Sequence, residues 1–544
     1  MDLMAKHFAH GEFSLYYWGQ QYYGVLDPIL LIPIFKVFGF GPLASQILPY
    51  IFSVTFLILI YYVLKEMFDR STANLATLIL AIGSPYFLQV VFETYSYIIT
   101  LNFGLLCWLA FRKIRLGSAS KIVIFLVGIF MGVCWYYFQL IGLFWAAWIL
   151  SFLIPRIRRE HIFKVEMYLR SLTPKRVWRE WILLSEVSMP PMARYILISV
   201  NLVNIINAIV SLILWIHGDF IGVVGRHTIK LFFSPVCEST IQMTALVLAG
   251  VYWRELKIWF IQECRKNSLH VWAFGFLIGY FPAIAGSILG QAPRSNTTIV
   301  SLPLVSKNIQ IALTEVFPFM IGFSMPPIFQ YGVTLLFIAG ILELMREIAM
   351  EFKNKETLKD IQLNPFAILV VLNLVVVLFF MRIGDYLNAR YLLPLYVGVQ
   401  VGIARFLLRL GPRMHRLSWV ILILFLLANV DIERRIFSGS PRPALYYDIA
   451  RFLVKKDIKG GYANVALAYP ITAYTDEKVI VSPIRDGCRY KPYEDFVRAL
   501  NKIVVLGEKP LPLQSIELIQ GMRYRVLDVG NLNGTPLMVM EKIN

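Results

Sequence analysis

Long runs of apolar residues recur along this chain and constrain its fold more than any other feature. A helix needs about 17 to 25 apolar residues to cross the hydrocarbon core of a bilayer. Because unpaired peptide groups are costly in lipid, such runs are expected to be α-helices. The twelve candidate spans, some of them short, are residues 42–64, 72–90, 95–111, 121–136, 137–154, 195–216, 239–260, 270–290, 327–345, 365–381, 391–408 and 417–431.

Charge supports this interpretation. Only 16% of the residues are charged, whereas a soluble domain carries about 25%. The net charge of +18 would indicate nucleic acid in a soluble protein, but here the Lys and Arg residues concentrate in alternate loops. Such loops are usually cytoplasmic. The positive charge therefore reflects the orientation of the chain in the membrane. We expect the bilayer, not nucleic acid, as the partner.

The loop pattern also orients the chain. The most basic loop, residues 155–194, is predicted to be a cytoplasmic connector lying on an anionic leaflet. By parity, residues 1–41 and 432–544 lie outside. A forty-residue external N-terminus has no obvious means of export without a preceding span. We therefore expect a transmembrane helix upstream of Met1, with unaided export as the alternative.

Residues 432–544, the C-terminal tail, differ in composition from the apolar part of the chain. Helical patterns at 444–454 and 493–500 alternate with short strand patterns, which predicts a small α/β domain. The predicted strands are residues 463–468, 478–482, 502–506, 524–529 and 537–541. The fold class is thus a polytopic α-helical membrane protein of about twelve transmembrane helices with a small C-terminal α/β extracytoplasmic domain. The expected divisions are an external loop (1–41), a multi-span domain (42–431) and the external domain (432–544).

The first external segment mixes aromatic rings with amide and carboxylate groups. Rings stack on the C–H face of a sugar, while amides and carboxylates hold its hydroxyls. The alternative is an interfacial aromatic belt, which explains the rings but not the polar groups. The candidate sugar-binding residues are Glu12, Tyr17, Gln20 and Tyr22.

The same segment carries a family resemblance. Residues 17–27, Tyr-Trp-Gly-Gln-Gln-Tyr-Tyr-Gly-Val-Leu-Asp, resemble the first external loop of bacterial membrane glycosyltransferases of the GT-C class, related to protein O-mannosyltransferases and aminoarabinose transferases. Further segments resemble the same class, each weakly but in the same order. They are Leu3-Met4-Ala5-Lys6-His7, Gly132 with Trp135 and Tyr136, Gly275 with Gly279 and Pro282, residues 389–396, and tail segments at 461–463, 468–472 and 489–493.

The resemblance implies transfer of a sugar from a polyprenyl phosphate to an acceptor, which is an envelope glycan, lipid or protein. The reaction would occur on the outer face of a bacterial or archaeal cytoplasmic membrane. The family commonly uses a carboxylate of this loop as general base, often in an Asp-Glu pair after the first span. By spacing, that pair would precede Met1, where topology also expects a missing helix. Asp2 is the nearest carboxylate present.

Three carboxylates are therefore candidate catalytic residues: Asp2, Asp27 and Glu93. Glu93 has no basic neighbour in sequence and would bind the acceptor, or a divalent metal shared with the donor phosphate, unless it is an ordinary loop acid. Asp27 precedes Pro28, so a helix N-cap role competes with a role in the site. No metal site is predicted, because His217 and His227 lack a carboxylate at ligand spacing.

Arginine is the expected ligand of the donor phosphate, since its planar fork grips phosphate with two hydrogen bonds. Arg390 begins a span on the outer side and is the first candidate for this role. The alternative is that its side chain extends to the membrane interface without binding phosphate. Tyr391, Arg382 and Asp385 flank it, and Arg294 is a second phosphate candidate.

Two other functions remain open. A transporter or flippase of a lipid-linked saccharide would place polar residues near the bilayer midplane, whereas here charge gathers on the outer side. A catalytically inactive relative of the same class is the other alternative. No nucleotide is expected, and the chain shows neither a P-loop nor a dinucleotide-binding glycine pattern.

Overall fold

The computed structural model describes residues 1–93, 95–115, 119–153, 269–288, 302–317, 327–354, 363–380, 390–410, 442–484, 489–507, 515–532 and 534–543, with a few single positions between them. The predicted connector 155–194 and the predicted spans 195–216 and 239–260 lie outside these residues. Most of the predicted span 417–431 does as well.

The described part of the multi-span domain is helical. Its helices are α3 (Pro42–Ser45), α4 (Ile47–Met67), α5 (Arg70–Ile82), α6 (Pro85–Glu93), α7 (Tyr95–Arg115), α8 (Lys121–Tyr137), α9 (Ile141–Leu153), α14 (Leu269–Ile288), α15 (Leu302–Ile311) with a π-helical turn η5 (Ala312–Val316), α17 (Pro327–Asn354), α18 (Pro365–Phe380) and α19 (Leu393–Arg409). Among the residues that the structure describes, three stretches are long and apolar enough to cross a membrane: Leu43–Met67, Ser96–Ile114 and Arg390–Arg409. The expected count of about twelve is not confirmed.

One predicted span is two helices. Residues 72–90 divide where α5 ends at Gly83 and α6 begins at Pro85. Gly83 has φ of +63°, a conformation that favours glycine and ends a helix, and proline is well suited to the first turn of the next one. The apolar run 121–154 divides at residues 138–140 into α8 and α9, as expected.

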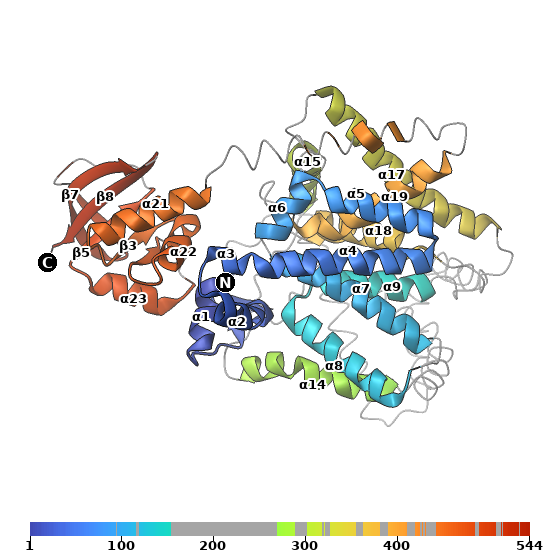
Figure 1. Cartoon of the computed structure of the whole chain (residues 1–544), viewed down its shortest axis with the longest axis horizontal. Helices are drawn as coiled ribbons and strands as arrows, with labels where there is room; N and C mark the ends of the chain where they lie inside the picture. The colour runs from blue at the N-terminus through green and yellow to red at the C-terminus, as the bar shows by residue number, and fades with distance from the viewer. Residues whose placement is uncertain are drawn as a thin grey trace, which may run out of the picture.

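Ion pairs join α5, α17 and α19 at one end of the helices. Arg405 Nε lies 2.6 Å from Glu347 Oε1, and its Nη1 lies 3.4 Å from Asp69 Oδ2. Arg409 Nε lies 2.8 Å from Glu343 Oε2. These groups belong to the end predicted to be cytoplasmic. The N-terminal segment and the C-terminal domain lie together at the other end (Figure 1).

Helices α8 and α14 pack through glycines with almost no side chain between them. A Cβ atom on Gly132 would lie 2.2 Å from the Phe276 carbonyl oxygen, and one on Gly279 would lie 2.0 Å from the Ile129 carbonyl oxygen. Small residues four apart let helices approach this closely in membranes. The glycine seam consists of Gly128 and Gly132 on α8 and Gly275 and Gly279 on α14.

The C-terminal domain is a mixed sheet with helices on both faces. Its strands are β3 (Gly460–Ala463), β4 (Ile480–Pro483), β5 (Lys502–Leu506), β6 (Ile516–Ile519), β7 (Met522–Leu532) and β8 (Thr535–Lys542), in the order β4-β3-β5-β8-β7-β6. Strands β4, β3 and β5 are parallel, and the rest pair antiparallel. The domain is α/β as predicted, and β6 was not anticipated.

Alternating residues of β5 build the two cores of this domain. Val504 and Leu506 pack with α21 (Arg442–Lys455) and α22 (Val465–Tyr474). Ile503 and Val505 pack on the other face, with α23 (Lys491–Ala499). The two-residue period of a strand produces this division.

The predicted strand 463–468 is wrong for most of its length. Only Ala463 belongs to a strand, because Asn464 starts α22: its side chain accepts a hydrogen bond from the Leu467 N–H at 3.0 Å. An N-cap of this kind stabilises the helix. The apolar run 465–468 therefore packs a helix on the sheet and does not extend the strand.

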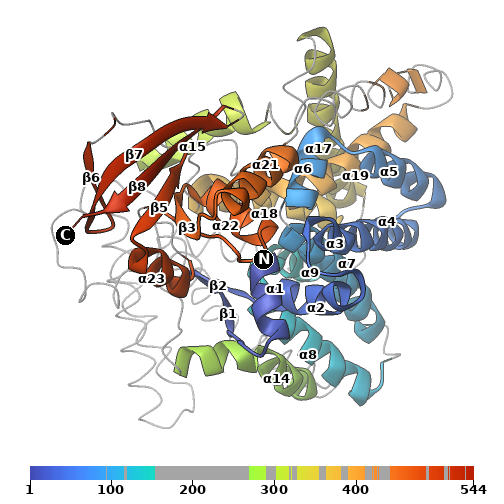
Figure 2. The ribbon, with the colours of Figure 1, turned by 60° about the vertical axis from the view of Figure 1, so that its left-hand side comes forward.

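The N-terminal segment consists of α1 (Asp2–Ala9), a hairpin of β1 (Tyr16–Tyr17) and β2 (Gln20–Gly24), and α2 (Leu26–Phe38). It lies between the ends of α8 and α14 and the C-terminal domain (Figure 2).

Candidate functional site

The N-terminal hairpin is held against the C-terminal ends of α8 and α14. The Tyr16 hydroxyl donates to the Ala283 carbonyl at 3.1 Å, and the Tyr136 hydroxyl donates to the Leu15 carbonyl. The Tyr16 ring fills the space above Gly286, where a Cβ atom would come within 2.4 Å of it. The aromatic residues of the hairpin are thus placed by contacts with the membrane helices.

Asp27 is the most buried carboxylate of the N-terminal segment. It lies in the first turn of α2, is 0% exposed, and accepts hydrogen bonds from the Tyr23 and Tyr137 hydroxyls. Val25, not Asp27, is the N-cap of this helix. Burial raises the pKa of Asp27 to about 6, although the two hydroxyls oppose that rise.

Tyr17 lies near Asp27, because its ring centroid is 5.5 Å from that of Tyr23, which binds Asp27. Burial raises the pKa of the Asp2 carboxyl, while the charge of the N-terminal ammonium and a hydrogen bond from Ser45 oppose the rise. Burial also raises the pKa of Tyr17, the charges of Asp27 and Asp2 raise it further, and Arg489 lowers it. Both Asp2 and Tyr17 keep part of their surface exposed. Two carboxylates and one arginine therefore act on a single tyrosine, an arrangement that we name the Asp2–Asp27 cluster.

Arg489 reaches this cluster from the C-terminal domain. It packs on the hairpin turn at Gly19, where a Cβ atom would lie 3.0 Å from the Arg489 Cα, and Gly19 has φ of +66°. The Arg489 N–H donates to the Tyr469 hydroxyl at 2.6 Å. The turn therefore needs glycine both for its backbone conformation and for this contact.

Arg390 lies in a short turn before α19 that Asn373 holds in place. The Asn373 side chain donates to the Tyr391 carbonyl at 3.0 Å and accepts from the Leu395 N–H at 3.3 Å. The Arg390 guanidinium lies 5.2 Å from the centroid of the Tyr391 ring, a cation–π distance. The predicted phosphate ligands are thus adjacent and fixed by a fully buried amide.

A series of rings connects Arg390 to the Asp2–Asp27 cluster. The Tyr391 and Tyr97 centroids lie 6.2 Å apart, Tyr97 and Phe138 5.3 Å, and Phe138 and Tyr23 5.5 Å. The Tyr23 hydroxyl in turn binds Asp27. The structure therefore brings predicted phosphate and acid–base residues, 363 positions apart for Asp27 and Arg390, to one end of the helices.

The remaining predicted site residues are less informative. Glu12 binds His7 and Tyr490. Gln20 begins β2, partly buried, and Tyr22 lies in the same strand. Glu93 ends α6, but its side chain lies outside the described residues, as do Arg294, Arg382 and Asp385. Within the part of the chain that the structure describes, no three His, Cys, Asp or Glu side chains are grouped to hold a metal.

A cluster that the sequence did not reveal joins α1 to the C-terminal domain. Lys6 Nζ lies 2.7 Å from Asp476 Oδ1 and 2.7 Å from Glu477 Oε2. His7 Nε2 lies 2.9 Å from Glu477 Oε1, and its Nδ1 lies 2.6 Å from Glu12 Oε2. We name this the His7 cluster. Lys6 and Asp476, like His7 and Glu477, are 470 positions apart, so no local pattern could have paired them.

Aromatic contacts complete the same junction. The Trp18 and Tyr490 rings stack with centroids 3.9 Å apart, and the Tyr493 hydroxyl donates to Glu477 at 2.6 Å. Hydrogen bonds from His7, Lys6 and Tyr493 outweigh burial and lower the pKa of Glu477 to about 2. The C-terminal domain is therefore bound to the N-terminal segment by both charge and ring stacking.

Comparison with known proteins gives few matches. No protein-family model matches the chain, and no curated protein does. Among solved structures, ArnT from Cupriavidus metallidurans bound to undecaprenyl phosphate aligns at 12% identity and a TM-score of 0.36, over 99% of this chain and 92% of that one. The apo structure of the same protein aligns at 14% identity and a TM-score of 0.36, with the same coverage. This likeness is too low to assign the chain to a family.

Proposed function

We propose that this protein is a membrane glycosyltransferase that moves a sugar from a polyprenyl phosphate to an acceptor hydroxyl on the outer face of a cytoplasmic membrane. The observation that carries the proposal is the Asp2–Asp27 cluster. Raised carboxylate pKa values are typical of groups that exchange protons during catalysis. The cluster lies at the end of the helices where the external domain approaches.

Asp2 is the better candidate for the general base. It keeps part of its surface exposed, whereas Asp27 is fully buried beneath Tyr23 and Tyr137. A base must come within hydrogen-bond reach of the proton that it accepts. Asp27 is then a positioning residue, which orients the two tyrosines and places a second negative charge near Asp2 and Tyr17.

The reaction needs one proton transfer and one substitution. The Asp2 carboxylate takes the proton of the acceptor hydroxyl, and the hydroxyl oxygen forms a bond to the anomeric carbon of the donor sugar. The bond between that carbon and the phosphate oxygen breaks, and polyprenyl phosphate leaves with the bonding electrons. Arg390 binds this phosphate, where its guanidinium stabilises the charge that develops.

The test is transfer by the purified full-length protein. A polyprenyl-phosphate sugar extract from the native membrane is supplied with native envelope fractions, and release of polyprenyl phosphate is followed by mass spectrometry. We expect Asp2→Asn to lower the rate by about 10²- to 10⁴-fold, the usual contribution of a general base. Asp528→Asn is the matched control, because its carboxylate is exposed and bonds only the neighbouring Val529 N–H.

Other outcomes would reassign the base or reject the proposal. Loss of transfer in Glu93→Gln with full transfer in Asp2→Asn would move the base to Glu93. Movement of the lipid-linked sugar across vesicles without product would indicate a transporter. If the protein neither transfers the sugar nor moves the lipid-linked sugar with any envelope fraction, it is an inactive relative.

A further inference from the structure

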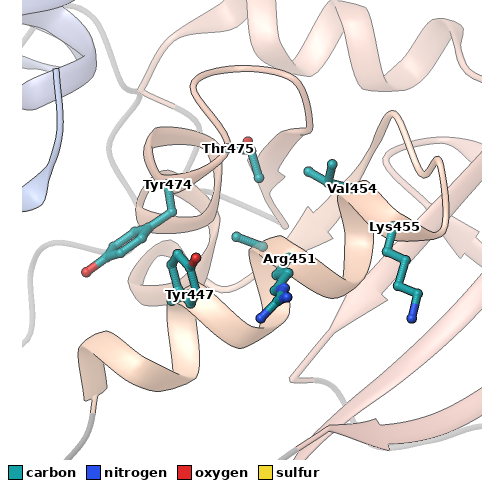
Figure 3. Close-up of a pocket in the computed structure, with 7 residues that line it drawn as sticks. Tyr447, Arg451, Val454, Lys455, Tyr474 and Thr475 are labelled. Atoms are coloured by element: carbon teal, nitrogen blue, oxygen red, sulfur yellow. The ribbon is translucent and has the colours of Figure 1, made fainter. Parts of the chain in front are cut away.

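The external domain carries a cavity that the proposed reaction does not use. It measures about 350 Å³, within the range of about 300 to 1,000 Å³ typical of small-molecule sites. One face of α21 forms one wall, and the end of α22 forms the other (Figure 3). The lining residues are Tyr447, Ala450, Arg451, Val454, Lys455, Tyr474 and Thr475.

The wall from α21 combines an aromatic ring with two positive charges. Tyr447, Arg451 and Lys455 follow one another at intervals of four residues, so they lie on the same face of the helix. All three side chains are exposed. Among the described residues, neither Arg451 nor Lys455 has an acidic partner in a salt bridge or hydrogen bond.

The wall from α22 is rigid. The Thr475 hydroxyl donates to the Val479 carbonyl at 3.0 Å and accepts from the Val479 N–H at 3.2 Å. Tyr474 precedes it and lies 6.2 Å, centroid to centroid, from Tyr446. Thr475 thus fixes the chain, and Tyr474 offers a second ring across from Tyr447.

The cavity lies in the part of the C-terminal domain that meets α1. The charge of Asp2, at the start of α1, contributes, after burial and Tyr446, to raising the pKa of Tyr474. The residues that follow the cavity wall, Asp476 and Glu477, bind Lys6 of α1. A molecule in the cavity would therefore extend toward the carboxylates that act on the acceptor.

We propose that this cavity binds the anionic part of the saccharide acceptor, a sugar ring bearing a phosphate or carboxylate. Tyr447 and Tyr474 stack on the ring, and Arg451 and Lys455 bind the anionic group. The assignment of the ligand as acceptor rests on the proposed function. The ligand is either a free saccharide or the headgroup of a glycosylated lipid, since both present the same chemistry.

Binding is tested separately from transfer. The full-length protein in phosphatidylcholine nanodiscs is titrated with glucose 6-phosphate, glucuronate, glucose and inorganic phosphate by saturation-transfer NMR. We expect the two anionic sugars to bind more tightly than either glucose or phosphate. The double variant Arg451→Ala with Lys455→Ala should bind the two anionic sugars about tenfold more weakly or worse, because hydrogen bonds to charged groups are lost.

Matched variants separate the cavity from general surface charge. Lys456→Ala removes an exposed charge from the same end of the domain but does not line the cavity, so binding should be unchanged. Tyr447→Ala should weaken binding, and Tyr447→Phe should restore it, since stacking needs only the ring. Equal binding of glucose 6-phosphate and phosphate, or full binding by the Arg451 and Lys455 double variant, would overturn the proposal.

Two further arms distinguish the ligand source and the underlying function. Nanodiscs containing phosphatidylinositol should compete with glucose 6-phosphate if the ligand is a lipid headgroup, and should not if it is a free saccharide. Asp2→Asn should keep sugar binding while losing transfer. Binding without any transfer by the wild type would reject the proposed function and leave the anionic-saccharide site standing.

Discussion

Asp27 shows how burial and hydrogen bonding compete at a single residue. Removal from water disfavours the carboxylate, while the Tyr23 and Tyr137 hydroxyls favour it, and the balance raises its pKa to about 6. Because the raised value lies near neutral pH, a small change in either tyrosine alters the charge of Asp27 under physiological conditions.

The pH dependence of transfer is the first prediction at this scale. Transfer should increase as pH rises through about 6, because Asp27 becomes ionised there and then supplies its negative charge near Tyr17. Tyr137→Phe removes a hydroxyl that favours the Asp27 carboxylate, so the rise should move to higher pH. The measurement is kcat/KM between pH 5 and 8, a window chosen around about 6. An unchanged profile in Asp27→Asn would show that Asp27 does not titrate in the reaction.

Asn373 is the second residue with a specific expected effect. Asn373→Leu removes both hydrogen bonds to the turn that carries Arg390, so KM for the polyprenyl donor should rise by about tenfold, with a smaller change in kcat. Asn102→Leu is the control, since Asn102 is also buried and donates to the Phe52 and Ile98 carbonyls away from the turn. A similar KM for both variants would mean that the turn does not position Arg390.

At the scale of elements, the glycine seam decides how α8 and α14 approach. The four glycines place backbone directly against backbone, and α8 also carries Tyr136 and Tyr137, which hold the hairpin and Asp27. The seam therefore fixes the position of α8, whose tyrosines contact the hairpin and Asp27. The glycines that resemble a family pattern have a packing role in this chain.

Substitution in the seam should separate the two helices. Gly279→Leu should lower stability by about 1 to 3 kcal/mol through overpacking and should also lower transfer, because the hairpin loses its support. The control is Gly332→Leu, since a Cβ atom at Gly332 in α17 meets nothing within 4 Å. Thermal unfolding in detergent checks both variants. Equal decreases in the unfolding temperature of the two variants would show that the seam is not under steric constraint.

At the scale of the whole molecule, the His7 cluster holds the C-terminal domain against the N-terminal segment. Carboxylates only accept hydrogen bonds, so His7 must donate from both ring nitrogens to Glu12 and Glu477, which requires its protonated form. Burial alone would lower the pKa of His7, but the two carboxylates outweigh it and the net shift is upward. Lys6, Asp476, Tyr490 and Tyr493 also face this junction.

The junction should therefore depend on pH in a defined direction. The contribution of His7 is present below its ordinary pKa of 6.5 and is lost as pH rises through the raised value. The contribution of Glu477 is present above 4.5 and is lost as pH falls toward about 2. The contact should be tightest between these limits and should loosen as the pH rises above 6.5 through the raised pKa of His7.

Hydrogen exchange of residues 475–479 measures this loosening directly. Exchange, after correction for the intrinsic rate, should increase as the pH rises through the raised pKa of His7. In the His7→Gln variant the same residues should exchange rapidly at every pH. His10→Gln is the control, because the His10 ring bonds only the Lys6 carbonyl of its own helix. Protection that is independent of pH in the wild type would argue against a protonated His7.

Local patterns predicted some parts of this molecule well. The strand at 502–506 and the division of 121–154 into two helices agree with the structure, because each depends on the hydropathy of its own residues. The strand at 463–468 failed because Asn464 caps a helix, and the span at 72–90 failed because Gly83 and Pro85 divide it. In both cases a single capping or breaking residue outweighed an apolar run.

The sequence by itself determined the apolar helices, the α/β tail and the chemical kinds of residue in the N-terminal segment. Those properties follow from composition and period over neighbouring residues. Only the tertiary structure decided that Asp27 is sealed beneath two tyrosines, that Arg489 approaches Tyr17, and that His7 meets Glu477. Burial and pairing depend on which distant segments meet in space, and that is a property of the packed chain as a whole.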